Sequence, residues 1–303
     1  MMPIRIGVVG LGKIARDQHL PAIAGNPKFE LAATVERSGA PSALNFTDYR
    51  DMLRSADLSA VAITTPPRPR YAIARDCIDA GKHVLLEKPP TATLSEIEDL
   101  RKRATTAGVT IFATWHAQHN GAVAEAQRIL AGRRVARMKI IWHEDVEKWH
   151  PGQRWIWEAG GFGVFDPGIN AFSIASRVFP GTLFVRGAEL VFPDGADTPI
   201  AAQVRFESPD SNGPLECSLD WRRAEGEEWT IELETEDGEI IRLADGGARL
   251  VVDGVEQPTS ALAEYPDIYR CFAELIDQER SKADVTPLRL VADCLLMGSR
   301  RAA

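Results

Sequence analysis

The chain has no long apolar run and few cysteines, which argues against a membrane-spanning protein and against a disulfide-rich one. No apolar run among its 303 residues reaches the roughly 18 residues that a membrane-spanning helix needs. No basic and apolar leader precedes the first expected strand, so we expect no signal peptide and a cytoplasmic protein. The four cysteines form no Cys-x-x-Cys pair and are expected to be reduced thiols: Cys77, Cys217, Cys271 and Cys294.

Positive charge is not in excess either. The chain has 35 lysine and arginine residues against 43 aspartate and glutamate residues, which gives a net charge of -8 and a pI near 5.4. Nucleic acids and anionic membranes attract basic surfaces, so neither is expected as the main partner, and a small molecule is the expected ligand. The length suits about two domains, and no internal repeat, low-complexity tract or flexible linker is visible.

A glycine-rich turn lies between an apolar strand at 4–9 and a helix expected at 14–24. In a dinucleotide-binding unit Gly10 permits the tight turn, Gly12 lets the backbone approach a pyrophosphate, and Ala15 allows close helix packing. The amino-terminus of the helix faces the anion. We therefore expect this turn to bind a dinucleotide cofactor through Gly10, Gly12, Lys13, Ile14 and Ala15.

Glu36 and Arg37 follow the second expected strand, at 29–35, and leave the choice of cofactor open. Glu36 lies close to where a ribose-binding acid is expected, and its carboxylate would repel a 2′-phosphate. Arg37 has a guanidinium that suits that phosphate. Because the carboxylate comes first, we expect NAD slightly ahead of NADP.

Strands and helices alternate up to about residue 118, which predicts a doubly wound parallel Rossmann sheet over residues 1–118. Further strands are expected at 60–64, 83–86 and 110–114, and helices at 48–55, 71–80 and 94–107. The loops after parallel strands meet at one edge of the sheet. We therefore expect four loop residues beside the cofactor: Thr65, Pro66, Glu87 and Lys88.

Lys88 is the main candidate for chemistry in this half. It ends the apolar strand at 83–86, and Pro89 and Pro90 after it stiffen the turn that would aim its ammonium group. The alternative is an exposed lysine before a proline-rich bend.

Residues 119–303 are expected to form a second, α+β domain for substrate binding and oligomerisation. Segments separated by glycine-containing turns predict a large, mainly antiparallel sheet, with strands at 187–191, 201–206, 215–221, 228–235, 239–243 and 248–252. Closing helices are expected at 265–279 and 288–300, with the possibility that they pack back on the first domain. A partner often covers one face of such a sheet, so we expect a homodimer or higher homo-oligomer.

Two features of this half suit a sugar. The loop at 149–157 has three tryptophans with His150 and Arg154 among them, and aromatic faces pack on the CH faces of sugars. A tryptophan-rich core or subunit contact is the alternative. Glu144 ends a strand expected at 134–144, and it is equally suited to a cleft or to an exposed rim.

Asp166 and Asn170 form the second chemical candidate. A glycine-rich approach at 160–163 leads to Asp166, which is expected to cap a helix that begins at Pro167. Asn170, four residues on, lies on the same side of the first turn. A carboxylate at a helix start is fixed and kept ionised, as a proton acceptor must be.

The glycine turn, Glu87-Lys88-Pro89 after a strand, and Asp166-x-x-x-Asn170 at a helix start together resemble the Gfo/Idh/MocA family of nicotinamide-dependent sugar oxidoreductases. Segments 13–21, 113–116, 149–157 and 163–170 are similar to its aldose 1-dehydrogenase branch. Many family members have histidine at the position of Asn170, and this departure moves proton transfer onto Asp166 or Lys88. The resemblance implies that five residues line the sugar site: His116, Glu144, Trp149, His150 and Asn170.

The implied reaction is hydride transfer from the anomeric carbon of a pyranose, D-galactose or L-arabinose, to NAD or NADP, giving a 1,5-lactone. Asp166 would accept the hydroxyl proton, Lys88 would stabilise negative charge, and Asn170 would fix its position. The roles of Lys88 and Asp166 can be reversed, because close opposite charges titrate as a pair.

Three alternatives stay open: a family oxidoreductase that acts on another sugar or polyol position, a regulatory protein and a metal-dependent protein. A cofactor-sensing regulatory protein on the same fold would have little reason to keep Lys88, Asp166 and the tryptophan loop together. A metal-dependent protein would leave the glycine turn unexplained, so no metal is expected. Its ligands would be His116, His119, Glu144 and His150.

Overall fold

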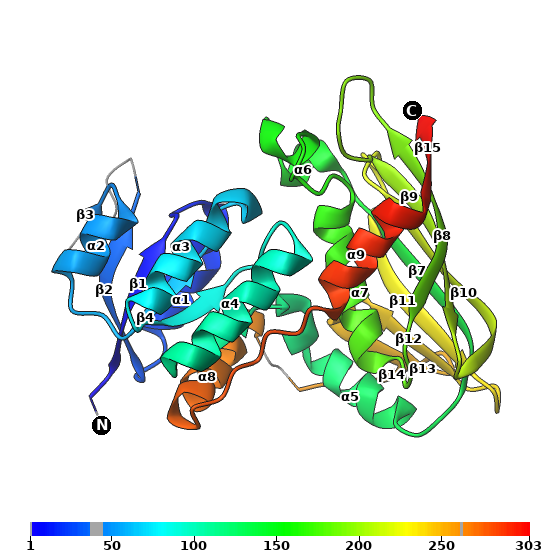
Figure 1. Ribbon diagram of the computed structural model, residues 1–303. Coiled ribbons are helices and arrows are strands. Elements are labelled where there is room, and N and C mark those ends of the chain that lie inside the picture. The colour runs from blue at the N-terminus through cyan, green and yellow to red at the C-terminus, as the bar shows by residue number, and fades with distance from the viewer. Residues whose placement is uncertain (1, 37–44, 261–262) are drawn as a thin grey trace. The chain divides into compact units, whose positions relative to one another are not determined.

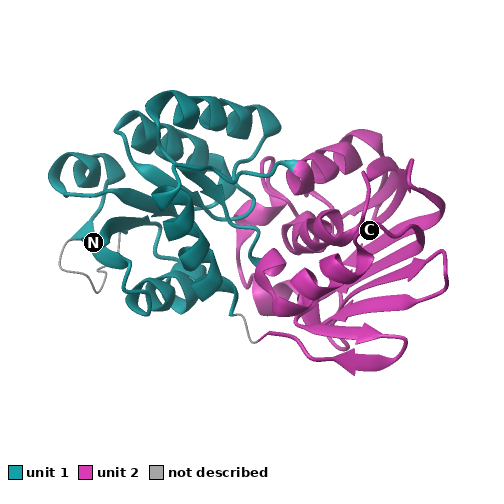
Figure 2. Cartoon of the chain, turned by 90° about the horizontal axis from the view of Figure 1, so that it is seen from below, with its two compact units in different colours: residues 1–116, 263–285 teal, residues 117–262, 286–303 magenta. Residues whose placement is uncertain are grey.

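The computed structural model describes residues 2–36, 45–260 and 263–303 (Figure 1). The chain divides into two compact units, residues 1–116 with 263–285 and residues 117–262 with 286–303 (Figure 2). The first unit thus contains, besides the amino-terminal residues, helix α8 (Glu264–Asp277) from near the end of the chain.

The first unit is built on a six-stranded parallel sheet with the order β3-β2-β1-β4-β5-β6. This is the strand order of a doubly wound dinucleotide fold, so the fold class predicted from the sequence is confirmed. Val9, Ile63, Leu86 and Ala113 are in register where their strands end, so the loops that follow begin at one edge. The strands are β1 (Ile4–Val9), β2 (Phe29–Val35), β3 (Asn45–Phe46), β4 (Ala60–Ile63), β5 (His83–Leu86) and β6 (Ile111–Ala113).

Helices cover both faces of this sheet. On one face, α1 (Leu20–Ala24) and α8 bury a single apolar cluster with Ile6 and Val8 of β1. On the other face, where Gly7 points, lie α2 (Tyr49–Ser55), α3 (Pro67–Asp79) and α4 (Leu94–Ala107). Helix α3 begins four residues before the expected start at Tyr71, because proline suits the first turn of a helix.

The turn that contains Lys88 leads into a well-capped helix. The Thr93 hydroxyl accepts from the backbone N–H of Glu96, and the Glu96 carboxylate accepts from the backbone N–H of Thr93. This capping box satisfies two helix-end donors at once and fixes where α4 begins. Gly108, with φ of 66°, ends the helix in the left-handed conformation.

The second unit is built on a nine-stranded sheet with the order β14-β13-β12-β11-β7-β10-β9-β8-β15. Neighbours are antiparallel except for the pairs β7 with β10 and β8 with β15, so the mainly antiparallel sheet is confirmed. The strands are β7 (Val135–His143), β8 (Phe184–Phe192), β9 (Ala201–Ser208), β10 (Ser211–Asp220), β11 (Glu228–Thr235), β12 (Ile240–Ala244), β13 (Arg249–Val252), β14 (Val255–Gln257) and β15 (Gly298–Ala302).

One face of this sheet is covered by three helices of the same unit (Figure 1). They are α5 (Gly121–Leu130), α7 (Phe165–Val178) and α9 (Thr286–Met297). Along β7, Met138, Ile140 and Trp142 are buried, while Arg137 and Lys139, on either side of Met138, are exposed. This alternation places the apolar side chains under the helices and the charged ones on the opposite face.

The end of the chain differs from the expectation. The helix predicted over 288–300 ends at Met297, and residues 298–302 form strand β15, which pairs in parallel with residues 188–192 of β8. A residue with a side chain would not fit at Gly298, because its Cβ would lie 2.5 Å from the carbonyl oxygen of Cys294. The glycine therefore permits the change from helix to strand.

All four cysteines are free thiols. Across the described residues, no helix combines the length and the apolar character needed to cross a membrane.

Candidate functional site

The glycine turn of the first unit has the backbone that its sequence predicts. Gly10 has a φ of +97°, and a Cβ there would lie 3.0 Å from the backbone nitrogen of Thr65. Gly12 is different, since a Cβ there would meet no atom within 4 Å. Gly10 is therefore needed for the turn itself, whereas the space over Gly12 is open for a ligand.

The residues around this turn fit the pyrophosphate of a dinucleotide. Ala15 is fully buried, which lets the first helix pack closely. The Thr65 hydroxyl is buried and finds no hydrogen-bond partner within the described parts of the chain. A buried polar atom of this kind at the end of β4, beside open space and a helix start, suits a polar ligand.

Glu36, the residue expected to select the ribose, is part of an ion pair. One Glu36 oxygen lies 2.5 Å from a terminal guanidinium nitrogen of Arg16. Sequence reasoning missed Arg16, which is a cation beside the acid that was expected to repel a 2′-phosphate. Arg37, the other residue considered for cofactor selection, lies outside the described residues. Lys13 pairs with Asp17 and is 83% exposed, and Ile14 is also exposed.

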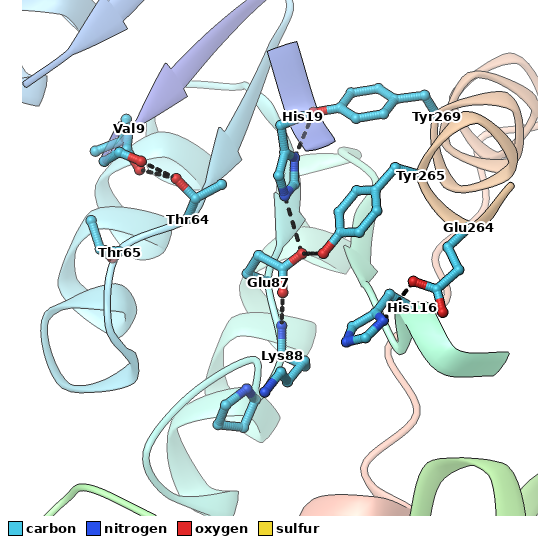
Figure 3. A network of polar contacts seen from close by, with 12 residues as sticks. Val9, His19, Thr64, Thr65, Glu87, Lys88, His116, Glu264, Tyr265 and Tyr269 are labelled. Carbon is cyan, nitrogen blue, oxygen red and sulfur yellow. Dashed lines mark hydrogen bonds and ion pairs between the residues drawn. The ribbon is translucent and has the colours of Figure 1, made fainter. Parts of the chain in front are cut away.

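Glu87 is the centre of a buried network in the first unit (Figure 3). Its Oε1 accepts from Tyr265 at 2.7 Å and from His19 Nε2 at 3.1 Å, and its Oε2 accepts from the Lys88 backbone N–H at 2.8 Å. A carboxylate only accepts, so Nε2 of His19 carries the hydrogen. In the neutral ring Nδ1 then accepts from the Tyr269 hydroxyl, 2.8 Å away.

This network keeps Glu87 ionised. Burial would raise the pKa of Glu87, which is 4% exposed, but the hydrogen bond from His19, the His19 charge when that ring is protonated, the charge of His116 and the Tyr265 hydroxyl lower it to about 2. Burial raises the pKa of both Tyr265 and Tyr269 well above the ordinary value, so both stay hydroxyl donors. The carboxylate therefore holds the Lys88 backbone at every pH of biological interest.

Arg70 holds the same turn from the side of α3. Its guanidinium is buried and donates to the carbonyl oxygens of Glu87 and Pro89, on either side of Lys88, and to that of Thr65. The loops after β4 and β5 are thus tied together by one side chain. No sequence signal distinguished this arginine from others on a helix surface.

His116 faces an acidic partner in the same unit. Its Nδ1 lies 2.9 Å from an oxygen of Glu264, and its ring stacks on that of Tyr265 with centroids 5.9 Å apart (Figure 3). Burial would lower the pKa of His116, but the Glu264 charge and hydrogen bond raise it above the ordinary value. The raised pKa therefore favours the imidazolium form of His116, in which both ring nitrogens are donors.

In the second unit, Glu144 is buried and lies between two indoles. Its Oε1 accepts from Trp221 Nε1 at 3.0 Å, and its Oε2 accepts from Trp229 Nε1 at 2.9 Å. Of the two positions that the sequence left open, the exposed rim is therefore wrong. The ring of Trp229 also meets that of Trp149, which is 42% exposed and donates to Glu227.

Asp166 belongs to the first turn of α7 and is not its N-cap, so that prediction is wrong. The helix begins at Phe165, because Gly163 adopts a φ of +52° and the Val164 N–H donates to the Pro199 carbonyl at 2.7 Å. Pro167 still fits, since the first turn of a helix needs no internal donor. Asn170 follows one turn later and is half-buried.

His150 is an ionisable partner of Asp166 in the second unit. His150 Nε2 lies 3.3 Å from Asp166 Oδ2, and the His150 ring packs edge-on against Trp221 at a centroid distance of 5.2 Å. Ring and hydrogen-bond contacts thus run without a break from Trp149 through Glu144 to Asp166. Sequence reasoning named four members of this group, Glu144, Trp149, His150 and Asp166, and missed Trp221 and Trp229.

Comparisons with known proteins show the family of the chain. The Gfo/Idh/MocA profile, described as an oxidoreductase family with an NAD-binding Rossmann fold, matches residues 4–114. The chain is 42% identical over 302 residues to a galactose 1-dehydrogenase of Pseudomonas fluorescens, covering 99% of this chain and 97% of the relative.

Two solved structures extend the comparison. The crystal structure of a D-galactose-1-dehydrogenase from Rhizobium etli matches with a TM-score of 0.94 and 45% identity, over 100% of this chain and 97% of that one. A 3-ketoreductase of Actinomadura kijaniata, solved with NADP and TDP-benzene, has a TM-score of 0.84 at 18% identity over 99% of each chain. At that identity the second likeness concerns the fold alone.

Replacing Gly10 and Gly12 separately should distinguish an effect on stability from an effect on cofactor affinity. Gly10→Ala should lower the unfolding temperature, because of its positive φ and the nearby Thr65 backbone. Gly12→Ala has room, so its stability should stay within about 0.5 kcal/mol of wild type, while affinity for NAD and NADP falls at least about tenfold. Thermal unfolding and calorimetric cofactor titration measure the two effects. Wild-type cofactor affinity in Gly12→Ala would contradict the site.

The charge of Glu87 should give the fold a distinctive response to acid. The pKa of Glu87 is lowered from 4.5 to about 2, so its stabilisation is complete above pH 4.5 and is lost as the pH falls towards 2. Glu87→Gln should be less stable at neutral pH and should lose less stability across that interval. Denaturant unfolding at a series of pH values measures this, with the exposed Glu98→Gln as control. Curves for wild type and Glu87→Gln that stay parallel would refute the charged network.

Proposed function

Because this chain belongs to the Gfo/Idh/MocA family of oxidoreductases, with an NAD-binding Rossmann fold, we propose that it is an NAD(P)-dependent aldose 1-dehydrogenase. It would oxidise the anomeric carbon of a pyranose to the 1,5-lactone. The observation that carries the proposal is the group around Asp166 and His150, in which a buried carboxylate and a histidine adjoin several indoles. Indole faces suit sugar CH groups, and the carboxylate suits the hydroxyl that must lose its proton.

The nicotinamide, when bound, supplies the acceptor for the hydride that leaves the anomeric carbon. Asp166 accepts the proton of the anomeric hydroxyl, because its carboxylate is held in the first turn of a helix whose dipole favours negative charge. Lys88 stabilises the negative charge that develops on that oxygen. Asn170 orients the same hydroxyl from the next turn of α7. The roles of Lys88 and Asp166 can also be reversed in this proposal.

The remaining polar groups bind the other hydroxyls of the sugar. Glu144 accepts hydrogen bonds from sugar hydroxyls through its two carboxylate oxygens, which the indoles of Trp221 and Trp229 hold in place. His116 donates, in keeping with its raised pKa. D-Galactose is the first candidate, since that sugar is named for both full-length relatives, and L-arabinose is the second, because it presents the same ring without the exocyclic carbon.

The preferred cofactor is NAD, with NADP as the second possibility. Glu36 can accept hydrogen bonds from both ribose hydroxyls once Arg16 releases one oxygen. Arg16 reduces the repulsion of a 2′-phosphate, so the preference is expected to be modest.

The chain is further proposed to act in the cytoplasm as a homo-oligomer. The support is that the unit's own helices cover one face of the nine-stranded sheet, and its outward-facing positions alternate with the buried ones. Light scattering on the purified protein measures its mass, and a monomer at micromolar concentration would contradict the oligomer.

The proposed activity is tested by following nicotinamide reduction with a set of aldoses, each paired with NAD and with NADP. We expect the highest kcat/KM with D-galactose or L-arabinose, and a lower value with sugars of the opposite configuration at C4. The matched variant is Lys88→Ala, in which turnover should be lost while cofactor affinity stays within about threefold, because the backbone contacts of the turn remain.

One outcome would contradict the proposed activity, and another would contradict only the role of Lys88. Absence of reduction with every aldose and both cofactors would favour a regulatory protein that only senses the cofactor. Turnover retained by Lys88→Ala would remove Lys88 from the reacting centre while leaving the activity in place.

A further inference from the structure

We propose that His150, held in a single tautomer by Gln153 and Trp155, receives the proton that Asp166 accepts and passes it to solvent. This proposal rests on the proposed function, since it concerns the fate of the proton taken from the sugar. It changes the role of His150 from a residue that lines the sugar site to a proton relay. It also assigns a positioning role to two residues of the loop whose side chains had none.

The backbone of the loop brings the three side chains together. His150 directly follows the short helix α6 (Val146–Trp149), and its N–H donates to the Val146 carbonyl at 2.8 Å. The His150 carbonyl in turn accepts from the Gln153 N–H at 3.2 Å. Gly152 has a φ of +67°, which permits this tight turn and returns the Gln153 side chain to the imidazole.

An indole determines how the Gln153 amide is oriented. Trp155 Nε1 lies 2.9 Å from Gln153 Oε1. An indole nitrogen can only donate, so the atom that it faces must be the amide oxygen and not the amide nitrogen. Trp155 therefore fixes the acceptor end of Gln153 in this position.

The oriented amide then determines the tautomer of His150. His150 Nδ1 lies 3.4 Å from the same Gln153 oxygen, which has no hydrogen to give, so Nδ1 must carry the hydrogen. In a neutral imidazole the other nitrogen, Nε2, is then an acceptor. That nitrogen is the one that lies 3.3 Å from Asp166 Oδ2. The neutral histidine thus presents a lone pair to Asp166 once that carboxyl group is protonated, whereas Nε2 carries a hydrogen towards the ionised carboxylate only in the imidazolium.

The difference in exposure gives the relay its direction. The Asp166 side chain is 7% exposed, and that of His150 is 19% exposed. In each turnover the O–H bond of the protonated Asp166 breaks and an N–H bond forms at His150 Nε2, which leaves a carboxylate facing an imidazolium. The imidazolium then gives its proton to water or buffer and returns to the neutral tautomer. No electrons are exchanged in these steps.

Packing keeps the ring in the orientation that the relay needs. The His150 ring meets Trp221 edge-on, with an interplanar angle of 63°. Trp221 is itself fixed, because its Nε1 donates to Glu144 Oε1. A ring flip would put carbon atoms where the two nitrogens lie and break the contacts of both with Gln153 and Asp166.

The first experiment is chemical rescue. In His150→Ala, kcat with saturating aldose and NAD should fall at least about tenfold, because the group that accepts the proton from Asp166 and transfers it to solvent is removed. Imidazole, added at fixed pH and constant ionic strength, should restore activity several-fold with a saturating dependence, while the wild-type kcat should not respond. His143→Ala removes another half-buried imidazole of the same unit, bonded to Ser218, and should show neither effect.

The second experiment tests the tautomer without removing the histidine. Gln153→Met has nearly the same volume but no acceptor, so the hydrogen is free to move to Nε2; kcat should fall several-fold with KM within about twofold. Gln153→Glu keeps an oxygen in the same place and should retain most of the wild-type kcat. A loss of binding alone would raise KM in both variants.

The outcomes separate the relay from the proposed function. A wild-type kcat in His150→Ala, or a lowered kcat that no imidazole concentration restores in a folded protein, would overturn the relay while aldose oxidation by the wild type stands. Equal kcat values in Gln153→Met and Gln153→Glu would overturn the tautomer argument. If the wild type oxidises no aldose, the proposed function fails first, and the relay fails with it.

Discussion

The buried carboxylate of Glu87 is the interaction on which the first unit depends. It binds a histidine of the first helix, a tyrosine of α8 and the backbone of Lys88 at once. Removing one partner of a buried charge typically costs about 3–5 kcal/mol, because the remaining group is left unsatisfied. A segment that is distant in sequence, α8, is therefore joined to the end of β5 by polar contacts that are costly to break.

The same carboxylate explains why Lys88 is held so firmly at the end of a strand. Its backbone N–H is bound by Glu87, and the carbonyl groups on either side are bound by Arg70. A lysine side chain has four rotatable bonds, so a fixed backbone is what limits the region that the ammonium can reach. The two prolines noticed in the sequence stiffen this turn, but the buried arginine and glutamate determine its position. The stability of the first unit and the position of Lys88, the candidate catalytic group, thus depend on the same few contacts.

The fold was predictable from the sequence where local signals were strong. Hydrophobic periodicity located five of the six strands of the first sheet, all but the two-residue β3, and the order of glycines around Gly10 and Gly12 predicted different roles for them. The helix at the end of the chain was overextended because Gly298 interrupts a segment that otherwise suits a helix. The start of α7 was placed two residues late, since an aspartate before a proline is a common cap and the role of Gly163 depends on the distant Pro199.

The candidate site was predictable only for residues whose motifs are local. Lys88 and Asp166 stand in such motifs, whereas Tyr265 and Tyr269 contribute through contacts with residues far away in sequence. Arg70 was missed because a helix surface normally exposes its arginines, and only the tertiary structure shows three carbonyl groups converging on this one. Pairing of this kind depends on the paths of several loops and leaves no periodic signal.

The tryptophans of the second unit have a further role that their number alone does not suggest. Four indole nitrogens there donate to side-chain oxygens: Trp149 to Glu227, Trp155 to Gln153, and Trp221 and Trp229 to Glu144. An indole can donate only from its edge, so each of these bonds also fixes the plane of a ring. The aromatic faces that suit a sugar and the acceptor atoms that suit its hydroxyls are therefore positioned by the same bonds. Replacing such a tryptophan with phenylalanine would keep most of the apolar face but release the acceptor, and this is why ring content alone is a poor guide to specificity.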